Sequence, residues 1–175
     1  TRVQGERVRV MQEYLDKISE ESTPAIVLTR ENYVKVMEQE GCPEYLIDAV
    51  RDQVEAGEHV EGFMAAGKVF LMADGLGSIE DSRITYIHER QHTFNRTNPQ
   101  LVKRVANALE SKEKAIAILK SFVGERALKA YKNLPIEGLA DEIVAFSMEV
   151  VYSNEEFSVD LQSRGIPSEV ISIIT

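Results

Sequence analysis

Apolar residues recur at helical spacing in the first part of the chain and predict an amphipathic helix over residues 1–21. The apolar face of this helix consists of Val8, Met11, Leu15 and Ile18. Residues 25–29 form a short apolar run rich in β-branched side chains, which predicts a buried strand. Two further helices are predicted, one over 29–39 with Thr29 as its N-cap and one over 44–54.

The central part of the chain changes from strand spacing to helix spacing. Residues 59–64 and 68–73 flank a short turn that contains glycine, and they predict a β-hairpin. Ser78 then caps a predicted helix over 78–94, which residues 95–99 end. Three isoleucines of this helix are expected to be buried: Ile79, Ile84 and Ile87. The strand just before the helix is suited to receive an extended peptide along its edge, and a purely structural hairpin is the equal alternative.

The rest of the chain is helical in pattern. The predicted segments are 100–109 capped by Asn98, 112–122 capped by Ser111, 125–132 after Gly124, 136–151, 155–164 and a last turn after Pro167. We therefore predict an α+β fold that is mostly helical, with a small sheet whose hairpin precedes the helix at 78–94. No repeat, low-complexity tract or flexible linker interrupts it, and we expect a single domain over 1–175.

Composition and charge narrow the possible partners. The 175 residues are 43% hydrophobic and 28% charged, as in an ordinary globular protein, and the net charge of −9 argues against binding to nucleic acid or an anionic membrane. Cys42 is the single cysteine, so we expect neither an intrachain disulfide nor a zinc site made of cysteines. The sequence shows no membrane-length apolar run and no signal peptide, so cytoplasmic residence is the default expectation. The chain begins at Thr1 rather than Met, which leaves room for a longer protein, and its oligomeric state is left open.

The candidate chemistry lies in the predicted helix at 78–94, in the segment His88-Glu89-Arg90-Gln91-His92. Residues four apart lie on one helix face, so His88 and His92 can share one zinc ion, and Glu89 can reach a water on that ion. Zinc lowers the pKa of its water to about 7, and a carboxylate can then take the proton and pass it to a leaving amine. The pattern therefore indicates metal-assisted hydrolysis, most often of a peptide bond. The alternative is a solvated helix face on which both histidines are ordinary polar residues.

A catalytic zinc site needs a third protein ligand, and the third histidine, His59, stands apart at the start of the hairpin. We expect a carboxylate from the helix predicted over 136–151, where Gly138, Glu142, Ala145 and Glu149 share one face. Glu142 is the preferred candidate, with Asp141 and Glu149 as alternatives. Asp141 is also a candidate to accept the second N–H of a ligating imidazole. The sequence does not choose among possible oxyanion-stabilising groups: Tyr131, Tyr152, His59 and the arginines.

Taken in order, the hairpin, the lead-in Gly77-Ser78-Ile79-Glu80-Asp81, the two-histidine segment and Ala140-Asp141-Glu142-Ile143-Val144-Ala145 resemble zincin-like metallopeptidase domains of bacteria and phages. The order is similar to the ImmA/IrrE group and to zincin domains within large polyvalent proteins of mobile elements. The resemblance implies a zincin-like α+β domain of the gluzincin type. Its zinc ligands would be His88, His92 and Glu142, with Glu89 as the general base.

The resemblance extends from Val60 to Tyr152. It implies a catalytic core over 59–152, preceded by residues 1–58, which carry no matched motif, and followed by C-terminal helices over 153–175. Such domains commonly have small or apolar residues where this chain has Arg90 and Gln91. A charged residue fits there if that side of the helix faces solvent or an acidic neighbour.

The leading hypothesis is a zinc-dependent peptidase that hydrolyses a peptide or protein substrate, with Zn²⁺ as cofactor and Glu89 as general base. The alternative is a catalytically degenerate zincin fold that serves as a metal-binding or interaction module of a phage or mobile-element protein. A helical interaction protein without metal remains if the two-histidine segment is accidental.

Overall fold

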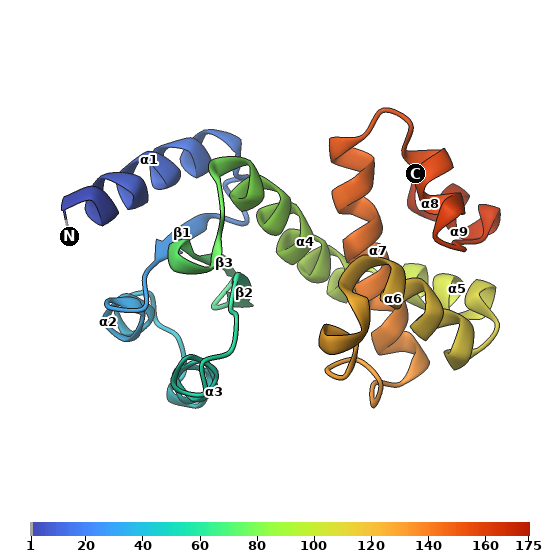
Figure 1. Cartoon of the computed structure of the whole chain (residues 1–175), viewed down its shortest axis with the longest axis horizontal. Coiled ribbons are helices and arrows are strands. Elements are labelled where there is room, and N and C mark those ends of the chain that lie inside the picture. The colour runs from blue at the N-terminus through green and yellow to red at the C-terminus, as the bar shows by residue number, and fades with distance from the viewer. Residues whose placement is uncertain (1) are drawn as a thin grey trace. The chain divides into compact units, whose positions relative to one another are not determined.

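The computed structural model describes the backbone of residues 2–175 and the side chains of residues 4–175 (Figure 1). The fold is α+β and mostly helical, as predicted, with a small mixed sheet of three strands. Backbone contacts divide the chain into two compact units, Thr1–Arg90 and Gln91–Thr175. The division falls inside one continuous helix, α4 (Ile79–Thr97), so each unit includes part of this helix. The expectation of a single domain stays a prediction.

The first unit contains the sheet. Its elements are α1 (Arg2–Ile18), β1 (Ala25–Leu28), α2 (Tyr33–Gln39), α3 (Glu44–Glu55), β2 (Gly62–Ala65), β3 (Lys68–Met72), a short 3-10 helix η1 (Ala73–Gly75) and the first part of α4. The elements match the predicted ones to within a few residues, and Thr1 of the first predicted helix lies outside the described residues.

The strand order is β1-β3-β2, with β1 parallel and β2 antiparallel to β3. β3 is therefore the central strand and is paired on both sides, for example Val69 with Ala25 and with Met64. The suggestion that the strand just before α4 offers its edge to a peptide is wrong. The reason is that β1, from an earlier part of the chain, pairs with the edge of β3 that the hairpin leaves open.

Alternating side chains bury both faces of this sheet. Val69 and Leu71 pack with Met11 and Leu15 of α1, and Tyr86 of α4 joins this cluster. Phe70 and Met72 face the opposite way, and the cluster that they join includes Met37 of α2 and Ile47 of α3. The first unit is thus a sheet with helices on both faces, as Figure 1 shows for α1 on one side and α2 and α3 on the other.

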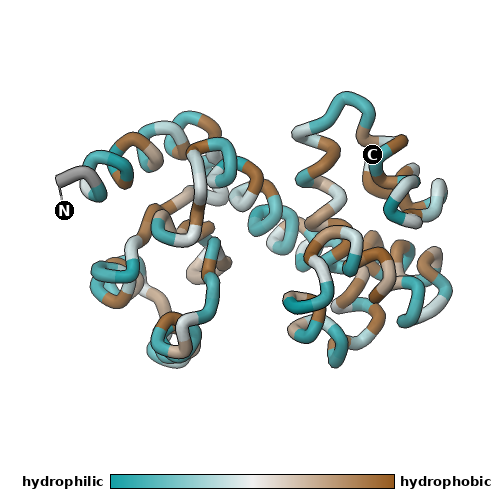
Figure 2. Tube along the Cα trace, in the orientation of Figure 1, coloured by the Kyte–Doolittle hydropathy of each residue, from teal (hydrophilic) through white to brown (hydrophobic). Residues whose placement is uncertain are grey.

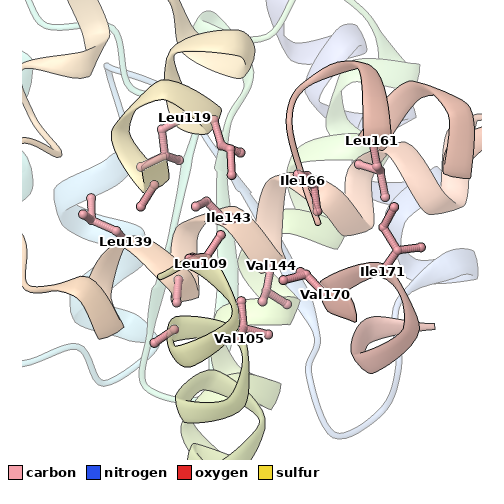
Figure 3. Close-up of a cluster of buried hydrophobic side chains, with 14 of the residues drawn as sticks. Val105, Leu109, Leu119, Leu139, Ile143, Val144, Leu161, Ile166, Val170 and Ile171 are labelled. Carbon is pink, nitrogen blue, oxygen red and sulfur yellow. The ribbon is translucent and has the colours of Figure 1, made fainter. Parts of the chain in front are cut away.

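The second unit is a bundle of helices around α7 (Ile136–Ser153). Three helices pack against α7: α5 (Pro99–Leu109), α6 (Lys112–Leu128) and α8 (Phe157–Ser163). The last helix, α9 (Ser168–Ile174), packs on α5. Figure 3 shows its core, in which Leu139, Ile143 and Val144 of α7 meet side chains of the other helices. Figure 2 shows that α7 is richer in hydrophobic residues than α4, which is mainly hydrophilic. In the part of the chain that the structure describes, no helix is both long enough and apolar enough to cross a bilayer.

Local signals set several helix boundaries. The Ser78 hydroxyl accepts a hydrogen bond from the amide of Asp81 at 3.1 Å, and Ser111 accepts one from Lys114 at 3.2 Å, so both predicted N-caps are confirmed. Gly124 has a positive φ of 75° and interrupts α6, also as predicted.

Three local predictions are wrong. Thr29 does not cap α2: its hydroxyl accepts from the Asn32 amide in a turn, and the helix starts at Tyr33. Asn98 does not cap α5, because its side-chain amide donates to the Phe94 carbonyl at the end of α4. Of the three isoleucines expected to be buried in α4, only Ile87 is buried; Ile79 is exposed and Ile84 half-buried.

Candidate metal centre

α4 places three potential ligands close together. His88, Glu89 and His92 each offer one ligand atom, and these atoms lie within 4.8 Å of one another. The helix is regular through this stretch, so the two histidines stand one turn apart on one side, as their spacing predicts. All three side chains are half-buried, which leaves them accessible to water while limiting their motion.

Two acids of α7 lie against His92. Its Nδ1 donates to Asp141 Oδ2 at 2.9 Å, and its Nε2 is 3.4 Å from Glu142 Oε1. The His92 side chain is only 12% exposed and that of Glu142 19%. Each ring nitrogen of His92 therefore faces a different acid. The three side chains form a second group of potential metal ligands.

The apolar face of α7 explains why these acids point to His92. Residues on both sides of the acids are fully buried in the core, namely Leu139, Ala140, Ile143 and Ala145. This packing fixes the rotation of α7 and leaves Asp141 and Glu142 half-buried at the edge of the core.

The sequence offered four further candidates: His59, Tyr131, Glu149 and Tyr152. Among the described residues, Glu149 belongs to neither group of potential metal ligands, and nor does His59, whose exposed ring pairs with Glu61 at 3.1 Å. Tyr131 packs its ring edge-on against Phe146, and Tyr152 is exposed. Of the three acids, Asp141 and Glu142 are therefore the two with a described contact to His92.

The charge of His92 reflects its two acidic neighbours. Burial disfavours the imidazolium, but hydrogen bonds and charges from Asp141 and Glu142 outweigh burial and raise the pKa of His92 to about 10. Without a metal ion, a proton therefore supplies the positive charge that lies between two carboxylates. A divalent cation bound at Nε2 would take over that role and displace the proton.

Two buried amides that the sequence analysis overlooked complete this side of the centre. Asn95 donates from Nδ2 to Asp141 Oδ1 at 2.7 Å, and Gln91 donates from Nε2 to Asn95 Oδ1 at 2.9 Å. The predicted helix stops before Asn95, but α4 continues to Thr97 and Asn95 is 2% exposed. The available signal was the spacing of Gln91 and Asn95, four residues apart on the helix.

The two residues between Glu89 and His92, namely Arg90 and Gln91, both have partners. Arg90 donates to Glu20 at 3.1 Å and lies over the Tyr86 ring, with its guanidinium carbon 5.7 Å from the ring centre. This acidic neighbour is the kind of environment that the sequence analysis required for a charge at this position. Gln91 is buried and bonded to Asn95, so its polarity is also satisfied.

No protein-family model, curated protein or solved structure matches this chain.

Among the described residues, His92 is common to both groups of potential metal ligands, and one distance can be compared with the geometry of zinc. Zinc binds nitrogen and carboxylate oxygen at about 2.0–2.2 Å, which separates two tetrahedral ligand atoms by about 3.4 Å. His92 Nε2 and Glu142 Oε1 are 3.4 Å apart. Asp141 at the opposite ring nitrogen is the outer carboxylate that ligating histidines commonly carry.

Proposed function

We propose that this chain is a zinc-dependent peptidase in which His88, His92 and Glu142 hold the metal ion and Glu89 is the general base. The observation that carries the proposal is the arrangement around His92. One nitrogen donates to Asp141, while the other faces Glu142 at the spacing of two zinc ligands. A surface histidine on a solvated helix would not need two acids from a distant helix.

Each side chain has a separate task in the proposed reaction. Asp141 accepts the Nδ1 proton of His92 and so holds the ring in the tautomer whose Nε2 can bind the metal. When bound, zinc would supply Lewis acidity toward the scissile carbonyl and lower the pKa of a coordinated water. Glu89, next to His88, accepts the proton of the attacking water and delivers it to the leaving amine.

Zinc analysis of purified protein with matched variants tests the proposal. The wild type should hold one zinc per chain, and His88→Ala or Glu142→Ala should lose it, because each removes one of three protein ligands. His59→Ala is the matched control and should retain zinc, since His59 lies outside both groups of potential ligands. A wild-type protein that holds no stoichiometric zinc when supplied with it would overturn the proposal.

Hydrolysis of a mixed peptide library separates the peptidase from the metal-binding module. Glu89→Gln should keep its zinc and lose about 10²–10⁴-fold in rate, because binding needs the ligands and turnover needs the base. Wild-type protein that holds zinc and cuts no peptide would instead support a metal-binding or interaction module.

A further inference from the structure

Four side chains of the second unit form a continuous hydrogen-bonded series. Gln91 donates to Asn95 at 2.9 Å, Asn95 donates to Asp141 at 2.7 Å, and Asp141 accepts from His92 at 2.9 Å. The Asn95 amide lies also 3.4 Å from the Asp141 backbone carbonyl. Three of these residues come from two turns of α4, and Asp141 comes from α7.

Burial makes each of these bonds important. Asn95 is 2% and Gln91 9% exposed, and a buried amide that loses its partner is destabilising because water cannot replace that partner. The carboxylate of Asp141 accepts, so the amide nitrogen of Asn95 faces it. The carbonyl oxygen of Asn95 then accepts from Gln91. The direction of every bond in the series is thereby determined.

The series of hydrogen bonds ends at His92, the candidate metal ligand. Asn95 occupies Oδ1 of Asp141, which leaves Oδ2 for the Nδ1 proton of His92. With both oxygens assigned, the plane of the carboxylate is set, and the imidazole ring follows it. The Nε2 atom of His92 is then held toward Glu142.

We propose that Gln91 and Asn95 are positioning residues of the metal centre, which act through Asp141 to aim His92 Nε2 at the metal. This inference rests on the proposed function. It gives a reason for a buried glutamine directly before the second histidine, where a small residue could not reach Asn95. Neither amide belongs to the proposed set of metal ligands.

Zinc affinity of the folded protein tests the inference, measured by competition with a chromophoric chelator. Asn95→Leu keeps the size of the side chain and removes its hydrogen bonds, and it should weaken zinc binding about 10–100-fold. Gln91→Leu should cause a smaller loss. The double variant should bind no more weakly than Asn95→Leu alone, because both residues act along one series. Asn98→Leu is the matched control: Asn98 also donates its amide at the end of α4, but to Phe94, and zinc affinity should not change.

Thermal unfolding of the metal-free variants separates positioning from a structural link between α4 and α7. Loss of stability with unchanged zinc affinity in Asn95→Leu would overturn the inference, as would unchanged affinity in Gln91→Leu if Asn95→Leu fails to fold. In both cases the wild type still binds zinc and the proposed function stands. Failure of the wild type to bind zinc would overturn both.

Discussion

At the scale of single residues, His92 lies between two acidic side chains. Its two nitrogens face different acids, and the buried amide of Asn95 holds one of those acids. The charge on the ring therefore matters for the folded state even when no metal is bound. A pH series is the direct way to see it.

The metal-free protein should lose stability as the pH rises from about 6.5 to about 10. The pKa of His92 is raised from 6.5 to about 10 in the folded chain, so folding favours the protonated ring. This contribution is fully present below pH 6.5 and is lost as the pH rises through 10. Thermal unfolding with a chelator present should show the largest difference between wild type and His92→Gln at pH 6. A difference that is the same from pH 6 to pH 10 would contradict the assignment.

Ala66 is a residue in an unfavourable backbone conformation. It has a positive φ of 50° in the two-residue turn between β2 and β3, and Gly67 follows with φ 73°. An L side chain is disfavoured there by about 1–2 kcal/mol, whereas glycine and asparagine are common in such turns. Ala66→Gly should therefore raise the free energy of unfolding in urea by roughly 1 kcal/mol. Ala65→Gly, one residue earlier in β2 and buried, should lower it.

At the scale of elements, α4 is a mainly polar helix held by specific contacts. The Tyr86 hydroxyl donates to the Thr23 carbonyl at 2.8 Å and accepts from the Glu20 amide at 3.0 Å. Further along, Asn95 bonds to Asp141. Such a helix depends on its caps and partners more than an apolar helix does, because little hydrophobic burial stabilises it.

Ser78→Ala should destabilise the first turn of α4. It removes the hydroxyl that accepts the Asp81 amide, and N-cap losses of this kind lower stability by about 1 kcal/mol. Hydrogen exchange at the Asp81 amide should become faster. Ser153→Ala removes an exposed hydroxyl at the C-terminal end of α7 and should leave that exchange rate unchanged. Unchanged exchange at Asp81 in Ser78→Ala would mean that the cap contributes little.

At the scale of the whole molecule, each compact unit has its own core. The first unit uses the two faces of a sheet, and the second uses one contiguous apolar cluster around α7. The same helix that carries Asp141 and Glu142 also supplies Leu139 and Ile143 to this cluster. The position of the acids is therefore a consequence of how the second core packs.

Leu139→Ala should lower the free energy of unfolding by about 2–5 kcal/mol, because it leaves a cavity beside fully buried neighbours. Val159→Ala is the control: its side chain is 66% exposed, and a change within about 0.5 kcal/mol is expected. Chemical denaturation measures both. Equal effects of the two substitutions would show that the cluster around α7 contributes little to stability.

Much of the local structure could be predicted from the amino-acid pattern. Helical periodicity, β-branched runs and glycine turns located nearly every helix and strand. Ser78 and Ser111 are N-caps, as predicted. The spacing of His88 and His92 indicated one helix face because a regular helix makes that geometry unavoidable. These features depend on a few neighbouring residues. Thr29 and Asn98 show where local prediction of N-caps fails, because each side chain bonds to another nearby backbone group.

By itself, then, the sequence determined the elements and the mostly helical α+β class, and it indicated a set of candidate metal ligands. Only the tertiary structure decided that β3 is central, that Asp141 and Glu142 divide the ring of His92, and that Gln91 and Asn95 hold Asp141. The physical reason is distance along the chain. His92 and Asp141 are 49 residues apart, and their meeting depends on how the apolar face of α7 packs in the second core, which no local pattern encodes.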